Sequence, residues 1–283
     1  MQTMNRVFGT IGLTLFALSA FGQTAEQRGS CEREYSPRSG QAGKDVIWVP
    51  TPDELVTSML KLASVTADDI VYDLGAGDGK IAIAAAKQFG ARAVGVEYNP
   101  DMAKFAQCLA NAAGVADKVK IVQGDIFETD FSTATVVTLY LLTELNLKLR
   151  PTLLKMRPGT RVVSHSFLMG DWHPDERIDD EGYDRAYLWI IPAQLAGTWE
   201  LRADNRPPLT LKLTQKYQAV EGEVIDGNQE APIRNATLRG DELTFNYVGR
   251  NNLVAVKAKI SNDQLNAAIT DGPTTITYQG RRR

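Results

Sequence analysis

The sequence holds few of the residues that build metal clusters and disulfide frameworks. Its 283 residues include two cysteines, Cys31 and Cys108, and two histidines, His165 and His173. Two cysteines are too few for a disulfide framework or a four-ligand metal cluster, and two histidines argue against a histidine-rich metal site. We therefore predict no metal site, and we expect Cys108, which falls inside a predicted helix, to be a small core residue.

An excess of charge of either sign is also absent. The formal net charge is -3, with 43% hydrophobic and 23% charged residues, which is typical of an ordinary globular protein. This balance gives no reason to expect non-specific nucleic-acid binding, so we predict no nucleic-acid partner. We expect the three arginines at 281–283 to form a solvated end of the chain.

The apolar run near the N-terminus, residues 7–21, is shorter than the ~20 residues that a membrane-spanning helix needs. It follows a short basic segment and ends at Ala20-Phe21-Gly22, in which Ala20 and Gly22 are small residues placed for a cut before Gln23. This layout predicts a signal peptide over residues 1–22 and export to the periplasm or the medium. The alternatives are a buried helix or an uncleaved anchor, and only the anchor would bring the protein to a membrane. The polar residues 23–45 are expected to be a flexible lead-in.

From residue 46 onward, short apolar runs alternate with helical patterns. This alternation predicts an α/β fold, with a parallel sheet covered by helices on both faces. After about residue 197 the helical pattern stops, and short strands separated by glycine turns predict a small all-β sandwich or barrel over residues 197–283. The expected strands of the first domain, residues 46–196, are 70–74, 91–97, 119–123, 134–141, 161–167 and 187–191, and the expected helices are 80–88, 100–113 and 145–156.

A glycine-rich loop follows the first expected strand and opens the first expected helix. Glycines let a backbone turn sharply and approach a ligand closely, and such a loop lies at the carboxyl edge of an open α/β sheet. The spacing Gly-x-Gly-x-Gly after an acid differs from the Gly-x-Gly-x-x-Gly of most dinucleotide folds. The residues of the predicted cofactor loop are Asp73, Gly75, Ala76, Gly77, Asp78 and Gly79.

Two further acids end the next two strands. Glu97 ends the second strand, 24 residues after Asp73, where a carboxylate can accept hydrogen bonds from both hydroxyls of a ribose. Asp125 follows the third strand, where it can accept from an adenine amino group. The predicted cofactor site also includes their neighbours, with Ile126 and Phe127 packing the adenine ring and with Tyr98 and Asn99 beside Glu97.

The chemistry of these acids favours S-adenosylmethionine (SAM) over a dinucleotide. Asp73 and Asp78 lie beside the glycine loop, where they would repel phosphate groups. The same carboxylates suit the sulfonium and ammonium groups of SAM, because opposite charges favour the ionised form of each partner.

At these residues the chain resembles the class I (seven-strand) SAM-dependent methyltransferases. The resemblance implies a Rossmann-like seven-strand methyltransferase sheet, with Asp73 and the glycine loop holding the amino-acid part of SAM. Glu97 would hold the ribose and Asp125 the adenine. The segments 49–52, 71–81, 95–100, 136–142 and 158–167 are similar to the seven-strand protein-lysine methyltransferases, a group that includes the lysine methyltransferase of the ATP-synthase rotor ring. The similarity covers about residues 46–172. The chain also resembles exported bacterial methyltransferase-like proteins with a β-rich tail.

The acceptor pocket is expected where the fourth and fifth strands end. Methyl transfer mainly requires a neutral nucleophile placed ~3–3.5 Å from the methyl group, so a strong base is not required. We predict Tyr140 to orient the acceptor amine and His165 to act as a candidate base, with ordinary packing roles as the alternatives. Trp48 is expected to close the other side of the pocket.

Methylation of a protein lysine ranks first among the expected functions. Because SAM is made in the cytosol and the N-terminus predicts export, an exported non-catalytic binding protein on the same fold is one alternative. Methylation of a small molecule is the other.

Overall fold

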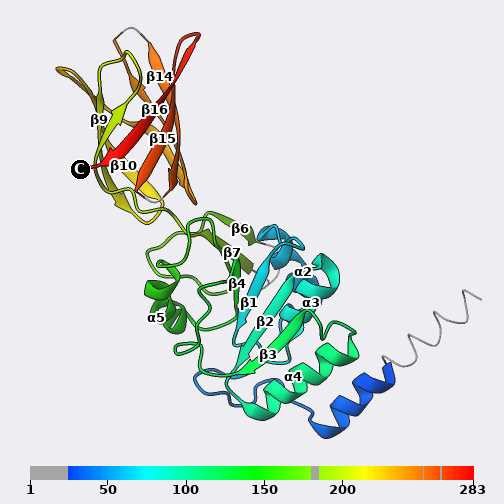
Figure 1. The fold of residues 1–283 in the computed structure, drawn as a ribbon. Helices are drawn as coiled ribbons and strands as arrows, with labels where there is room; N and C mark the ends of the chain where they lie inside the picture. The colour runs from blue at the N-terminus through cyan, green and yellow to red at the C-terminus, as the bar shows by residue number, and fades with distance from the viewer. Residues whose placement is uncertain (1–24, 180–184, 251, 262) are drawn as a thin grey trace, which may run out of the picture. The chain divides into compact units, whose positions relative to one another are not determined.

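The structure, a computed structural model, describes residues 25–179, 185–250, 252–261 and 263–283 (Figure 1). The predicted signal peptide, residues 1–22, lies outside the described residues. The chain divides into two compact units, Met1–Leu141 and Leu142–Arg283, which are described separately. In the part of the chain that the structure describes, no helix combines the length and the apolar character needed to cross a membrane.

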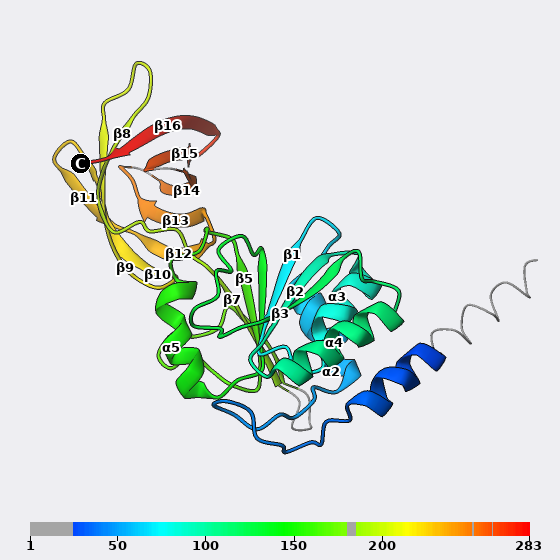
Figure 2. The same ribbon diagram turned by 60° about the horizontal axis from the view of Figure 1, so that its bottom comes forward.

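The first unit contains four parallel strands, of which the first two are each followed by a helix (Figure 2). The strands β1 (Ile70–Leu74), β2 (Arg92–Glu97), β3 (Val119–Gln123) and β4 (Val136–Leu139) lie in the order β3-β2-β1-β4. They alternate with the helices α3 (Lys80–Phe89) and α4 (Pro100–Ala112), as the sequence predicts. A further helix, α2 (Asp53–Leu62), precedes β1 and was not predicted.

The helices α3 and α4 begin at residues that favour the start of a helix. α3 lies between Gly79 and Gly90, both of which have positive φ, and it buries one alanine-rich face. α4 begins with Pro100 after Asn99, whose side-chain oxygen accepts hydrogen bonds from the backbone N–H groups of Asp101 and Met102. Proline at the first helical position and asparagine at the cap satisfy the free N–H groups at a helix start.

The second unit adds three strands that complete a seven-stranded sheet in the order β3-β2-β1-β4-β5-β7-β6. These strands are β5 (Arg161–His165), β6 (Glu176–Asp179) and β7 (Arg185–Ile190), and the helix α5 (Thr143–Leu153) precedes β5. β7 pairs antiparallel with both β5 and β6. The predicted parallel arrangement does not extend to this edge, where none of the described residues between β5 and β7 forms the helix that a parallel crossover needs.

Nine antiparallel strands form a second sheet in the C-terminal part of the second unit. Their order is β11-β10-β9-β8-β16-β15-β14-β13-β12, and β10 also approaches β12, so the sheet is nearly closed like a barrel. The backbone N–H of Ile233 donates to the carbonyl of Gly222 (2.9 Å) near this closure. The strands are β8 (Gly197–Arg202), β9 (Leu209–Lys216), β10 (Ala219–Asp226), β11 (Gln229–Pro232), β12 (Arg234–Arg239), β13 (Glu242–Val248), β14 (Leu253–Ser261), β15 (Gln264–Asp271) and β16 (Thr274–Arg282).

The terminal arginines take part in this second sheet and are exposed to solvent, as the sequence predicts. β16 runs to Arg282, and Arg282 lies over the Trp199 ring at 4.8 Å from the ring centroid. Its guanidinium also donates to the carbonyl oxygens of Gln194 and Ala196. These backbone contacts hold the last strand against the segment that leads into β8.

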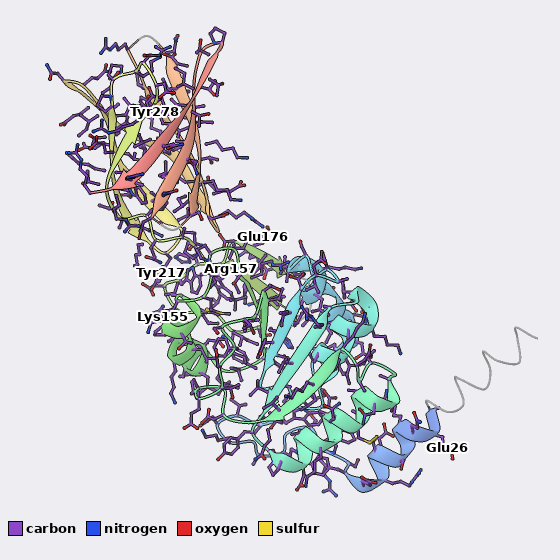
Figure 3. All side chains as sticks on the ribbon, viewed as in Figure 1. Glu26, Lys155, Arg157, Glu176, Tyr217 and Tyr278 are labelled. Carbon is purple, nitrogen blue, oxygen red and sulfur yellow. A yellow bond between two sulfur atoms is a disulfide. The ribbon has the colours of Figure 1, made fainter. Side chains whose placement is uncertain are left out.

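Buried tryptophans connect the two groups of strands within the second unit. Trp172 is fully buried, and its indole N–H donates to the side chain of Gln218 (2.8 Å). Trp172 also stacks on Tyr217 with 5.7 Å between ring centroids (Figure 3 labels Tyr217). A separate ion pair joins Arg239 of β12 to Glu176 of β6 at 2.5 Å (Figure 3 labels Glu176).

The predicted division into residues 46–196 and 197–283 stays a prediction.

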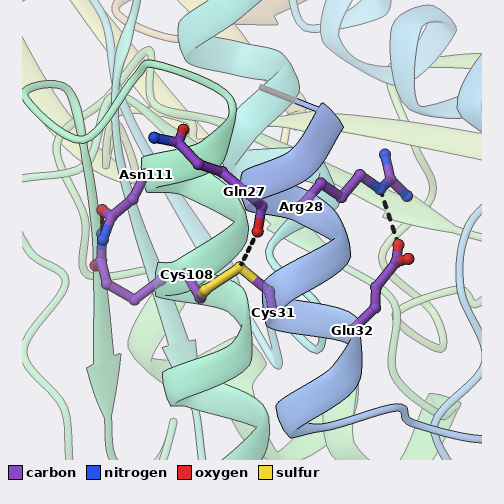
Figure 4. The surroundings of a disulfide bond; sticks show 7 residues. Gln27, Arg28, Cys31, Glu32, Cys108 and Asn111 are labelled. Carbon is purple, nitrogen blue, oxygen red and sulfur yellow. Dashed lines mark hydrogen bonds and ion pairs between the residues drawn. A yellow bond between two sulfur atoms is a disulfide. The ribbon is translucent and has the colours of Figure 1, made fainter. Parts of the chain in front are cut away.

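Residues 25–34 are helical, which corrects the expectation of a flexible lead-in over residues 23–45. Cys31 on this helical segment forms a disulfide with Cys108 on α4, with 5.9 Å between their Cα atoms (Figure 4). Tyr35 packs against Phe105 of α4 with ring centroids 5.7 Å apart. The expectation that Cys108 is only a small core residue is therefore wrong, because the fold brings together two cysteines separated by 77 residues.

Candidate cofactor site

The glycine loop connects β1 to α3 in a conformation that favours glycine. Gly75, Gly77 and Gly79 have φ values of 82°, 54° and 76°, in the left-handed region. The N–H groups of Gly75 and Ala76 both donate to the Val96 carbonyl at 2.9 Å, which fixes the loop on β2. A Cβ at Gly79 would lie 3.1 Å from the Cβ of Ala106, so glycine also permits close packing of the loop on α4.

Glu97 connects the end of β2 to the glycine loop. Its Oε2 accepts a hydrogen bond from the N–H of Gly77, and its Oε1 accepts one from the N–H of Asn99, both at 2.9 Å. Burial raises the pKa of Glu97, although these backbone donors oppose the shift. Each carboxylate oxygen retains a second lone pair, so Glu97 can accept further hydrogen bonds from a ligand.

Asp73, near the end of β1, is a buried carboxyl group with one unsatisfied oxygen. Its exposed fraction is 2%, and its Oδ1 accepts a hydrogen bond from the Thr138 hydroxyl of β4 at 2.7 Å. Its Oδ2 is buried without a hydrogen-bond partner. Burial raises the pKa of Asp73 to about 7, and the hydrogen bond from Thr138 opposes this shift. Thr138 was not predicted from the sequence as a partner of this acid.

Asp78 lies in the same loop, directly before Gly79, the N-cap residue of α3. Its Oδ1 accepts a hydrogen bond from the N–H of Lys80 at 3.2 Å, and burial raises its pKa. Lys80 in turn pairs with Asp53 at 2.9 Å and donates to the carbonyl of Thr51. The start of α2 is thereby connected to the start of α3 beside the loop.

Asp125 lies two residues after β3, where the sequence predicts an adenine-binding acid. Its Oδ1 accepts a hydrogen bond from the N–H of Phe127 at 2.9 Å, and its Oδ2 pairs with Lys44. Ile126 and Phe127 are half-buried. The Lys44 ammonium also lies over the ring of Tyr98, 4.8 Å from its centroid. Lys44 thus contacts two residues of the predicted cofactor site, a position that was not predicted from the sequence.

Lys44 lies near the tip of a small hairpin, residues 40–48. The hairpin is closed by hydrogen bonds from Gly40 N to Trp48 O (2.8 Å) and from Trp48 N to Gln41 O (2.9 Å). Trp48 packs with residues of α4, and its ring lies against the glycine loop: a Cβ at Gly77 would be 2.8 Å from Trp48 Cδ1. The structure therefore places Trp48 on the glycine loop.

Comparison with known proteins explains this set of acids around a glycine loop. Residues 73–176 match the family model described as the ANTKMT methyltransferase domain. A protein-lysine N-methyltransferase of Saccharolobus islandicus is 48% identical over 151 residues, which cover 52% of this chain and 94% of that protein. This chain belongs to the protein-lysine N-methyltransferase family.

Two further relatives match roughly half of the chain or somewhat less. The adenine nucleotide translocase lysine N-methyltransferase of Mus musculus is 34% identical over 123 residues, which span 43% of this chain and 53% of that protein. The crystal structure of an RNA methyltransferase from Salinibacter ruber in complex with S-adenosyl-L-homocysteine is 55% identical, with a TM-score of 0.51. It covers 52% of this chain and 96% of its own.

This family member is a SAM-dependent methyltransferase, and its described residues fit that cofactor. The orphaned Oδ2 of Asp73 is a buried acceptor beside the loop, suited to a cationic group. Glu97 has lone pairs available for two ribose hydroxyls. Asp73, the glycine loop and Glu97 lie together at the ends of β1 and β2, as the sequence predicts, and Asp125 lies beyond the end of β3. Asn99 caps α4 through its side chain and meets Glu97 through its backbone N–H.

The two predicted catalytic residues follow or end neighbouring strands of the methyltransferase sheet. Tyr140 comes directly after β4 in the first unit and is half-buried. His165 is the last residue of β5 in the second unit, is 4% exposed, and pairs with Ala186 of β7. Their roles in catalysis stay predictions.

Proposed function

We propose that this methyltransferase transfers the methyl group of SAM to a lysine amine of a protein. The observation that carries the proposal is the 48% identity to the protein-lysine N-methyltransferase of Saccharolobus islandicus across nearly the whole of that relative. The similarity to the mouse adenine nucleotide translocase lysine N-methyltransferase supports the same class of acceptor.

The residues of the first unit would hold the cofactor along its length. Glu97 would accept hydrogen bonds from the ribose hydroxyls while its contact with Gly77 N–H keeps the glycine loop in place. Asp73 would offer its unsatisfied Oδ2 to the ammonium group of the amino-acid part. Asp125 would accept from the adenine amino group, with Tyr98 and Phe127 beside the ring. The bound cofactor supplies an activated methyl group, and the protein's task is to position it.

The acceptor amine has to lose its proton before it can attack a methyl group. Tyr140 would orient that amine through its hydroxyl or the face of its ring. His165 is the candidate base, although its burial allows it to act only on a group that enters the protein interior. Replacing Tyr140 with Phe tests the hydroxyl: the methylation rate would fall while SAM affinity stays unchanged.

A methyl-transfer assay on proteins of the native organism tests the proposal. The full chain would be incubated with radiolabelled SAM and a cell extract, and acid hydrolysates would be searched for methyl-lysine by mass spectrometry. Glu97→Ala serves as the inactive control. Label recovered as methyl-lysine supports the proposal. Label elsewhere contradicts it, and SAM binding without any transfer favours the non-catalytic binding protein.

RNA is the second candidate acceptor, and two observations favour it. The Salinibacter ruber relative is described as an RNA methyltransferase. A cleft of about 870 Å³ in the nine-stranded region is lined by basic side chains, which attract phosphate groups. The arginines that line it are Arg202, Arg206, Arg281, Arg282 and Arg283, beside the acidic Glu200 and Asp204. In the same assay, label that ribonuclease releases and protease does not would establish RNA as the acceptor.

The predicted export is also part of the proposal, and the disulfide between Cys31 and Cys108 supports it. Disulfides persist in oxidising compartments and are rare in the cytosol. Fractionation of the native organism, with thiol labelling before and after reduction, tests this prediction. Protein found in the cytosol with both thiols reactive would contradict it.

A further inference from the structure

Lys44 lies on the groups that the proposed function assigns to the adenine end of the cofactor. Its ammonium pairs with Oδ2 of Asp125, while Oδ1 of the same carboxylate accepts from the backbone of Phe127. The same ammonium is 4.8 Å from the centroid of the Tyr98 ring. Adenine would need both the Asp125 acceptor and the ring face of Tyr98, so Lys44 and adenine require the same two groups.

The hairpin that carries Lys44 is held by contacts to other parts of the first unit at both of its ends. Trp48, at its base, lies against Gly77 and packs with residues of α4. Before the hairpin, Tyr35 accepts a hydrogen bond from the side chain of Gln41 at 3.0 Å. The disulfide from Cys31 fixes the preceding helical segment to α4. A tethered group acts at a high effective concentration. The Lys44 ammonium therefore contacts Asp125 and the Tyr98 ring without the addition of any other ligand.

We propose that Lys44 is an intramolecular competitor of the adenine end of SAM, presented by the hairpin of residues 40–48 and kept close by the Cys31–Cys108 disulfide. The proposal rests on the cofactor site of the proposed function. The competing contact is weak enough to be displaced, because both side chains retain solvent exposure, 34% for Lys44 and 15% for Asp125. Lys44 therefore lowers the affinity for SAM without closing the site.

The first test replaces Lys44 and measures binding of SAM and of S-adenosylhomocysteine by calorimetry. Lys44→Ala is expected to tighten both ligands by about two- to fivefold, which corresponds to the loss of one partly exposed ion pair. Lys44→Arg keeps the positive charge for Asp125 and should restore wild-type affinity. Lys104→Ala, on an exposed lysine of α4, makes the same change in net charge away from the site and should leave the affinity unchanged.

Comparing the two ligands separates competition from general electrostatics. S-adenosylhomocysteine has the same adenine as SAM but no sulfonium charge. Competition for the adenine groups changes both affinities equally, whereas a purely electrostatic effect changes the affinity for SAM more. An effect on SAM alone, or an unchanged or weaker affinity in Lys44→Ala, would overturn the proposal.

The second test concerns the disulfide. Replacing Cys31 and Cys108 together with Ser should tighten SAM binding when Lys44 is present and have no further effect in Lys44→Ala, because the tether acts through Lys44. Circular dichroism would verify that each variant is folded. A change of equal size in both backgrounds would overturn the role of the tether. If the wild-type protein binds no SAM, both the proposed function and this inference fail; if it binds SAM and Lys44→Ala does not tighten binding, only the inference fails.

Discussion

Asp73 is expected to make SAM binding depend on pH near neutrality. Burial raises its pKa to about 7, so the folded protein without cofactor keeps this carboxyl group mostly protonated below that pH and mostly ionised above it. A cationic ligand group binds the ionised form more strongly. Affinity for SAM should therefore increase as the pH rises through 7.

The size of the effect follows from the ionised fraction. With a pKa of about 7, about one tenth of Asp73 is ionised at pH 6 and about nine tenths at pH 8. If SAM binds only the ionised form, its affinity rises by roughly tenfold between these values. Binding at pH 6 should also release nearly one proton, because the ligand selects the ionised form.

Calorimetric titration in two buffers with different ionisation enthalpies measures both the affinity and the protons released. Asp73→Asn is the matched control: its affinity should be low at both pH values, and the proton release should disappear, which removes any titration of SAM itself from the comparison. Thr138→Val removes the hydroxyl that donates to Asp73 and stabilises its charge, so the midpoint should move to higher pH. Equal affinity of the wild-type protein at pH 6 and pH 8, without proton release, would refute the reasoning.

Three other substitutions test separate parts of the structure. Glu97→Gln should lose one charge-assisted hydrogen bond, worth about 1.5–3 kcal/mol, and weaken SAM binding in calorimetry; unchanged binding would remove Glu97 from the site. Gly77→Ala should lower the melting temperature, since the residue has a φ of 54° and a Cβ would meet Trp48, at a cost of at least about 1 kcal/mol; a neutral result would mean that the loop relaxes easily. Trp172→Ala should cost about 3–5 kcal/mol in denaturant unfolding, and a loss below about 1 kcal/mol would show that the tryptophan contacts in the second unit contribute little.

Several features of the cofactor site could be predicted because they depend on local sequence. A strand that ends in glycines, followed by a helix, fixes the loop at the carboxyl edge of the sheet. The acids Glu97 and Asp125 follow from the ends of the next two strands, since parallel neighbours present these ends along one edge. The cap of α4 by Asn99 is equally local, because capping involves residues close in sequence.

Other features depend on residues that only the folded chain brings together. Thr138 reaches Asp73 because β4 pairs directly with β1, and a strand order cannot be derived from the spacing of apolar residues. The antiparallel β7 likewise has the same local pattern as a parallel strand. The disulfide had one available signal, an even number of cysteines in a chain with a predicted export signal.

The sequence by itself determined the fold class, the glycine loop and the acids at the strand ends, because each is specified by periodicity and turn chemistry within short segments. Only the tertiary structure decided that Cys31 meets Cys108 and that Lys44 reaches Asp125, 81 residues further along the chain. Such contacts depend on how helices and loops pack across the sheet, and packing depends on shape and distance in space rather than on local pattern.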